Sequence, residues 1–118
     1  MQIWNVFDGD IHEGFNMFLD VNPKFVHGMQ AIITCLESLP GEPIWAYASG
    51  YQLNLMFSPI DSEPALSIFW DAPHYTIQAK TNRPIKAINL AGYGRYGSTN
   101  LVEASNCVVE LLHIIKSG

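Results

Sequence analysis

The chain has 118 residues, of which 48% are hydrophobic and 14% are charged, with a net charge of −5. This length excludes a second catalytic domain, a two-half dinucleotide fold and a large barrel, so we expect a single compact α+β domain over residues 1–118. The low charged fraction argues against disorder and predicts a sparsely charged surface, of the kind that a partner often covers.

We expect neither a membrane-spanning segment nor a secretion signal in this sequence. No stretch approaches the ~20 apolar residues that cross a bilayer, and the first residues lack a basic and apolar leader. Cys35 and Cys107 lie in apolar helical patterns and are expected to be reduced core thiols rather than a disulfide or a metal pair. We therefore expect a cytoplasmic protein.

The first forty residues predict one strand and two helices. Residues 2–7 form a short apolar run that stops at an Asp-Gly pair, which predicts a strand. Residues 11–19 place apolar side chains at i, i+4, i+7 and i+8 behind Asp10 as an N-cap, which predicts a short helix. Residues 24–39 carry one apolar stripe and end at a Pro-Gly pair, which predicts a longer helix.

The apolar period then changes from that of helices to that of strands. Short runs rich in β-branched and aromatic residues are divided by turn residues, at 44–48, 52–57, 66–70, 75–79 and 85–90. The short connectors favour an antiparallel meander, because parallel crossovers need a dozen or more residues. Residues 98–116 return to helical spacing, with Ser98 or Thr99 as the expected cap.

The predicted order of elements is therefore β-α-α-β-β-β-β-β-α. About five strands form an antiparallel β-meander, and two main helices pack against its apolar face. This arrangement is a two-layer α+β sandwich.

Acidic and basic residues are unevenly distributed along the chain. Residues 1–71 hold nine acidic residues against Lys24, a net charge of −8, whereas residues 72–118 hold five basic residues against two acidic ones. Such a separation creates a field that steers an oppositely charged partner, so we expect a basic protein partner.

Candidate partner-binding residues are acidic side chains in loops or at helix ends and the aromatic side chains near them. Asp61, Glu63 and Asp71 are favoured because they flank neighbouring strand turns beside Trp70. Tyr and Trp side chains anchor many protein interfaces. The full set of candidates is Asp61, Glu63, Asp71, Trp70, Tyr51, Asp10 and Glu13.

A glycine-rich segment separates the fifth predicted strand from the last helix. Its G-x-G-x-x-G pattern would indicate a dinucleotide site only if a further parallel strand and an acidic residue followed it. The remaining residues predict only a helix, so a dinucleotide site is not favoured. A turn is the first interpretation, and a weak anion site at the helix N-terminus is the alternative, formed by Gly92, Gly94, Arg95, Gly97 and Ser98. Residues 92–97 are similar to the glycine-arginine turn of Alba-type nucleic-acid-binding proteins, but the order of elements differs, and we transfer no function.

Asp8, Asp10, His12 and Glu13 lie within six residues, as at the start of a metallophosphoesterase site. Such a site needs further Asp, Asn and His ligands on later loops, and the other histidines stand alone. Capping of a helix by Asp10 is therefore favoured, and we expect neither a metal nor another cofactor. The motifs G-x-S-x-G and Walker A are absent, so no catalytic residue is assigned.

The combination of small size, an acidic first part and many aromatic residues favours protein binding. In size, charge and composition the chain resembles bacterial immunity proteins and antitoxins that neutralise basic nuclease toxins. The resemblance implies that a carboxylate-rich face covers the toxin's active-site cleft. Two alternatives stay open. One is a small-molecule enzyme or ligand-binding domain with a pocket between sheet and helices, and the other is nucleic-acid or anion contact through residues 80–97.

Overall fold

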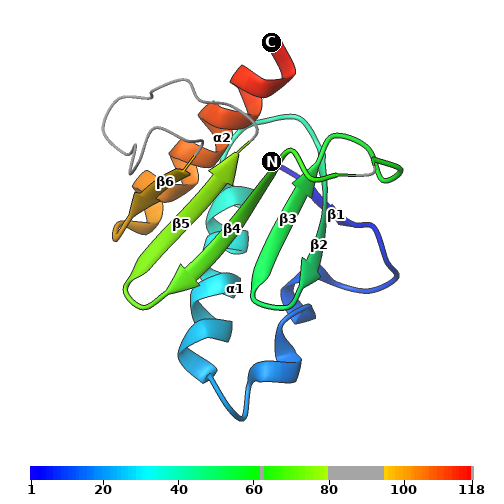
Figure 1. The fold of residues 1–118 in the computed structure, drawn as a ribbon. Helices are drawn as coiled ribbons and strands as arrows, with labels where there is room; N and C mark the ends of the chain where they lie inside the picture. Colours follow the sequence, from blue (N-terminus) through cyan, green and yellow to red (C-terminus); the bar gives the residue numbers. More distant parts are fainter. Residues whose placement is uncertain (62, 80–94, 118) are drawn as a thin grey trace.

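The computed structural model describes residues 1–61, 63–79 and 95–117. A six-stranded sheet, with strands in chain order, packs against helices on one side (Figure 1). The elements are β1 (Ile3–Asn5), the 3-10 turns η1 (Ile11–Glu13) and η2 (Asn16–Phe18), α1 (Pro23–Ser38), β2 (Ile44–Ser49), β3 (Gln52–Met56), β4 (Leu66–Asp71), β5 (His74–Ala79), β6 (Arg95–Ser98) and α2 (Leu101–Ser117). The predicted two-layer α+β architecture is confirmed.

Strands β2 to β6 form an antiparallel meander, and β1 adds to its edge in parallel. Ile3 lies opposite Ile44, and the long connection through α1 supplies the crossover that a parallel pair requires. The turn between β2 and β3 places Gly50 at a φ of 57°, a conformation that glycine adopts without steric cost.

The last strand differs from the prediction. The expected strand at 85–90 lies outside the described residues, and β6 forms at Arg95–Ser98, where the sequence predicted a turn. Tyr96 explains this strand: it lies opposite Ile77, and its side chain is fully buried in the core. Burial of a large aromatic side chain outweighs the preference of the neighbouring glycines for a turn.

The predicted helix at 11–19 is wrong. The chain instead forms η1 and η2, separated near Gly14, whose ideal Cβ would lie 2.9 Å from the Ala48 Cβ atom. Gly14 keeps helical dihedral angles, and the interruption falls at Phe15, which has φ −109° and ψ 6° and a fully buried side chain. Asp10 caps the first turn as expected, accepting a hydrogen bond from the His12 N–H at 3.0 Å.

Helix α2 begins later than predicted. Asn100, rather than Ser98 or Thr99, is its cap, because the Asn100 Oδ1 atom accepts a hydrogen bond from the Glu103 N–H at 2.9 Å. The Ser98 hydroxyl instead accepts a hydrogen bond from the Asn100 N–H at 3.0 Å, in the turn before the helix.

The core lies between the helices and one face of the sheet. Alternate side chains of the central strands point into it, as the period of two requires, and meet the apolar stripes of α1 and α2. Its fully buried members include Leu53, Leu55, Ile68, Ile77, Met29, Ile32, Ile33, Leu36, Val108 and Leu111. Both cysteine thiols are free, with Cys107 buried and Cys35 partly buried.

Candidate functional site

The sheet face opposite the helices is the main candidate surface, and we call it the open face. Both α helices lie behind the sheet in Figure 1, and no described helix covers its other side. Residues that pair across strands share a face, so the register defines which side chains the open face carries. The described side chains are Trp4, Trp45, Tyr47, Gln52, Asn54, Met56, Ser67, Phe69, Thr76 and Gln78, with Ser49, Asp71 and His74 at the strand ends. Among them, Asn54, Met56 and Ser67 are buried by their neighbours.

Aromatic side chains gather at the β1–β2 edge of the open face. Trp4 lies beside Trp45 on the neighbouring strand, and Tyr47 follows two residues later on the same face. The ring of Phe7 packs edge-on against Tyr47, with ring centroids 6.2 Å apart. Trp4 is 47% exposed and Phe7 66% exposed. We call Trp4, Phe7, Trp45 and Tyr47 the aromatic corner.

A buried polar cluster occupies the centre of the open face. The Asn54 Oδ1 atom accepts hydrogen bonds from the Gln52 amide at 2.8 Å and from the Ser67 hydroxyl at 2.7 Å. The Asn54 Nδ2 atom is buried and has no hydrogen-bond partner among the described residues. An unpaired buried donor costs free energy, so this amide is not explained by folding stability.

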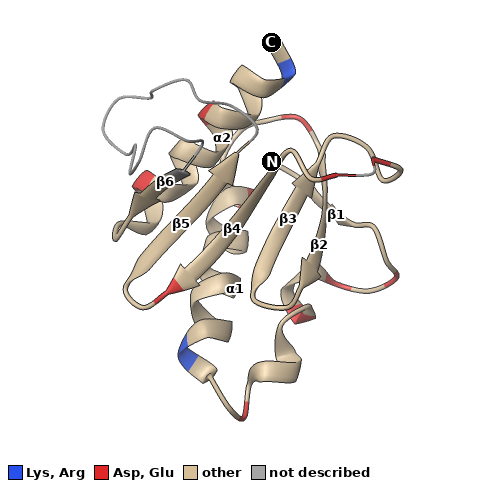
Figure 2. Cartoon of the chain, in the orientation of Figure 1, with Lys and Arg blue, Asp and Glu red and all other residues tan. Residues whose placement is uncertain are grey.

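Some acidic residues lie beside the open face, and others lie on the helices behind the sheet. Asp8, Asp10, Asp61 and Glu63 are in loops, and Asp71 ends β4, whereas Glu37, Glu103 and Glu110 belong to α1 and α2 (Figure 2). Apart from Asp71 and His74 at the β4–β5 turn and Arg95 opposite Gln78 in β6, the residues that the register places on the open face are uncharged. The accessible part of this face is therefore mainly uncharged and partly aromatic, and carboxylates lie in loops and at a strand end along part of its edge.

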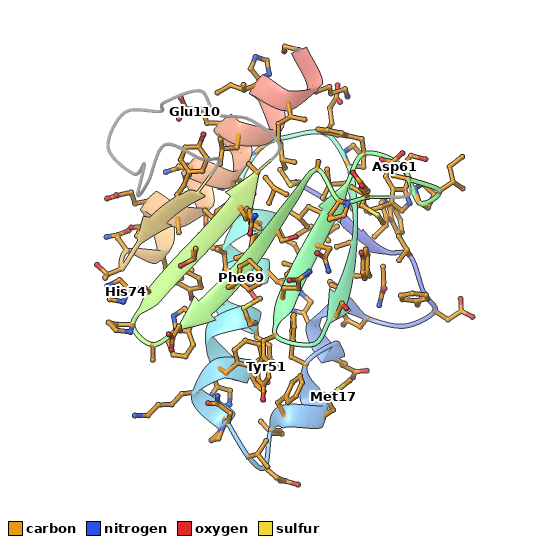
Figure 3. All side chains as sticks on the ribbon, viewed as in Figure 1. Met17, Tyr51, Asp61, Phe69, His74 and Glu110 are labelled. Atoms are coloured by element: carbon orange, nitrogen blue, oxygen red, sulfur yellow. The ribbon has the colours of Figure 1, made fainter. Side chains whose placement is uncertain are left out.

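The three favoured acidic residues do not form one patch. Asp61 and Glu63 lie in the loop before β4, and Asp71 ends that strand, so the six residues of β4 separate them by about 17 Å. His74 pairs with Asp71 at the β4–β5 turn. Figure 3 shows Asp61 and His74 at opposite ends of the sheet. The Asp61 Oδ2 atom also accepts a hydrogen bond from the Ser58 N–H at 3.1 Å.

Trp70 lies on the helix side of the sheet, apart from Asp61 and Asp71. An ideal Cβ at Gly28 of α1 would lie 2.5 Å from the Trp70 Cδ2 atom, so the indole rests directly on the helix backbone. Tyr75, opposite Trp70, donates a hydrogen bond from its hydroxyl to the Gly28 carbonyl oxygen at 2.8 Å. The structure therefore gives Trp70 a packing role.

Tyr51 is 54% exposed, as expected, at the β2–β3 turn. Its ring stacks on Phe18 at 4.4 Å and meets the edge of Phe25 at 5.0 Å. Figure 3 shows Tyr51 near Met17 at one end of the molecule. Tyr51 thus belongs to an apolar end that is separate from the aromatic corner.

Asp10 and Glu13 are exposed beside the β1 end of the sheet, close in sequence to the aromatic corner. His12, between them, pairs its Nε2 atom with the Glu37 carboxylate of α1. Within the described residues, no three His, Cys, Asp or Glu side chains form a group that could hold a metal ion.

The expected anion site is described only in part. Gly92 and Gly94 lie outside the described residues, as does the side chain of Arg95. Gly97 and Ser98 belong to β6 and line a hollow of about 360 Å³ that also contains the Glu103 side chain. A carboxylate in this hollow does not favour an anion.

A larger hollow, of about 830 Å³, lies between the start of β2 and the end of α2. Ile44, Trp45, Phe57 and Leu112 contribute apolar lining, and the ion pair between Lys116 and Glu42 lies at the same place. This hollow is the described feature that a small-ligand function would use.

Comparison of the chain with protein-family models, with characterised proteins and with solved structures finds no match. No helix in the described ranges has both the length and the apolar character needed to cross a membrane. The fold and surface define an α+β protein with one face of its sheet open, and its function is inferred from that face.

The sequence reasoning identified the acidic residues but missed the open face. The signal was present in β2, where the partly exposed Trp45 and Tyr47 alternate with the buried Ile44 and Ala46. Large aromatic residues at the solvent-side positions of a strand indicate a surface that another molecule covers.

Proposed function

We propose that the chain is a binding domain for a basic protein, which docks on the open face. The observation that carries this proposal is the mainly uncharged, partly aromatic face with the carboxylates of Asp8, Asp10, Asp61, Glu63 and Asp71 in loops and at a strand end beside it. Protein interfaces have the same arrangement, with aromatic residues enriched and charged residues depleted at the centre, inside a polar rim.

The charge of the whole chain supports a basic rather than an acidic partner. Its net charge is −5, and residues 1–71 hold nine acidic residues against Lys24. The resulting negative field accelerates encounter with a positively charged surface. The cleft of a nuclease is such a surface, because it must bind phosphates.

The specific role that we propose is that of an immunity protein or antitoxin. The domain would cover the active-site cleft of a basic nuclease and exclude its nucleic-acid substrate. We place this activity in the cytoplasm, and the two free thiols, Cys35 and Cys107, support a reducing compartment.

Affinity capture from the source cell, followed by mass spectrometry, tests this proposal. We expect the wild-type chain to retain a protein of high isoelectric point whose binding weakens with salt. The variant Asp8→Lys/Asp71→Lys, at two exposed positions, should slow association with the purified partner by about ten-fold at low salt. If the partner is a nuclease, the one-to-one complex should be inactive.

The exposed Val102→Ser change on α2 serves as the control and should leave association unchanged. Equal association rates for the wild type and the Asp8→Lys/Asp71→Lys variant would contradict docking on the open face. Retention of nucleic acid alone, or of a small molecule in the hollow beside Trp45, would favour one of the two alternative functions.

A further inference from the structure

We propose that the aromatic corner receives an arginine side chain of the basic partner. This inference rests on the proposed function and specifies the chemistry of one contact within it. The corner is formed by Trp4, Phe7, Trp45 and Tyr47, at the β1–β2 edge of the open face.

The geometry of the corner suits a flat cation. The rings of Phe7 and Tyr47 are nearly perpendicular, at 85°, with centroids 6.2 Å apart. Trp4 and Trp45 lie side by side on the adjoining strands, on the same face as Tyr47. Aromatic faces carry negative potential and attract Lys and Arg cations within about 6 Å of the ring centroid.

Exposure distinguishes this corner from the apolar end around Tyr51. Phe7 is 66% exposed and Trp4 is 47% exposed, so aromatic surface is available to a partner. At the apolar end, the face of Tyr51 is already stacked on Phe18 at 4.4 Å, with an interplanar angle of 23°. A cation would have to displace Phe18 there, whereas the corner requires no such displacement.

Charge at the corner favours arginine. Asp8 directly follows Phe7 in the sequence and is exposed, and Asp10 is exposed two residues later. A guanidinium group can stack on a ring and donate hydrogen bonds to a carboxylate at the same time, whereas an ammonium group is a point charge that is more strongly hydrated. The exposed Asp8, next to Phe7 in the sequence, therefore gives the corner a neighbouring carboxylate in addition to its aromatic rings.

Titration with defined peptides, followed by NMR, tests this inference. The probes are a short Gly-Arg peptide with three arginines, its lysine counterpart and its citrulline counterpart, in which an uncharged urea replaces each guanidinium. The indole N–H signals of Trp4 and Trp45 should shift with the arginine peptide. Trp70, on the helix side of the sheet, provides an internal reference that should not shift. The citrulline peptide should bind about five-fold or more weakly than the arginine peptide, and the affinity of the lysine peptide should lie between those of the other two.

Two variants make the test specific. Phe7→Leu retains an exposed apolar side chain but removes one ring, and it should weaken binding of the arginine peptide by about three-fold or more. Tyr51→Leu removes an exposed ring at the apolar end and should have no effect. Amide spectra of both variants establish that they are folded.

The outcomes separate this inference from the proposed function. Equal binding of arginine and citrulline peptides, or an equal effect of Phe7→Leu and Tyr51→Leu, overturns the assignment of the corner. If salt-sensitive capture of a basic protein persists in that case, the proposed function stands without this contact. If that capture also fails, both are wrong.

Discussion

Asn54 is the residue in the open face whose presence is least explained by stability. Its Oδ1 atom accepts two hydrogen bonds, but its buried Nδ2 atom donates none to the described residues. A buried polar group without a partner costs about 1–3 kcal/mol, whereas replacing both members of a polar pair by apolar groups is nearly neutral or stabilising. Asn54 and Ser67 form a pair on which this difference can be measured.

Ser67→Ala alone should lower the free energy of unfolding by about 1 kcal/mol, because Asn54 remains buried with one fewer hydrogen bond. The double variant Asn54→Val/Ser67→Ala should be at least as stable as the wild type. Urea unfolding of the wild type, both single variants and the double variant gives the coupling between the two positions. Simple additivity of the two single changes would show that the hydrogen bond contributes nothing.

The contact between α1 and β4 depends on Gly28. Alanine at an ordinary helix position is more favourable than glycine by about 1 kcal/mol. At this position, however, the new Cβ would overlap the Trp70 indole, whose Cε2 and Cε3 atoms would both lie 2.8 Å away. Overpacking of this kind costs about 1–3 kcal/mol, so Gly28→Ala should lower the melting temperature.

Gly28→Ala should have the opposite effect on the melting temperature once the Trp70 indole is removed. In a Trp70→Leu background, Gly28→Ala should raise the melting temperature relative to Trp70→Leu alone, because the helix propensity of alanine is then unopposed. Thermal unfolding followed by circular dichroism of the four proteins checks this. If Gly28→Ala is destabilising in both backgrounds, the overlap with Trp70 is not its cause.

Elements with a clear apolar period were predictable from the sequence. The stripes of α1 and α2 and the alternating runs of β2 to β5 each specify a buried face, and the structure has them within two or three residues of the predicted ends. Each such pattern is local, since it depends on neighbouring residues alone.

Other features depend on contacts between distant residues and were not predictable in this way. The helix expected at 11–19 is interrupted at Phe15, whose buried ring packs against Phe25 of α1. Strand β6 forms because Tyr96 enters the core opposite Ile77. The role of Trp70 was also misjudged, because its place on the helix side follows from the register of β4 rather than from its neighbouring acidic residues. Asp61 and Asp71 lie near the same strand in sequence but at its opposite ends in space.

Alkaline pH should destabilise the whole molecule through groups buried in the core. Burial, with a smaller contribution from Glu110 and Glu103, raises the pKa of the Cys107 thiol from 9.0 to about 12. Burial also raises the pKa of the Tyr75 hydroxyl. Above pH 9 the unfolded chain loses these protons first and binds fewer protons than the native state, so the free energy of unfolding falls as pH rises.

Cys107→Val should therefore reduce the slope of unfolding free energy against pH between pH 9 and 12. The change Val102→Ser, at an exposed position on α2, serves as the control and should leave the slope close to that of the wild type. Urea unfolding at several pH values measures all three slopes. Identical slopes for the wild type and Cys107→Val would contradict a raised thiol pKa.

The parallel strand β1 has a consequence for the solution behaviour of the molecule. Ile44 N–H donates to the Gln2 carbonyl oxygen, and Val6 N–H donates to the Ala46 carbonyl oxygen, each at 2.9 Å. Without β1, the six residues of β2 would present an unpaired strand edge beside Trp45 and Tyr47. Exposed edges of apolar strands recruit identical edges from other copies, and short edge strands blunt this tendency. Three residues at the start of the chain thus protect β2 from edge-to-edge aggregation.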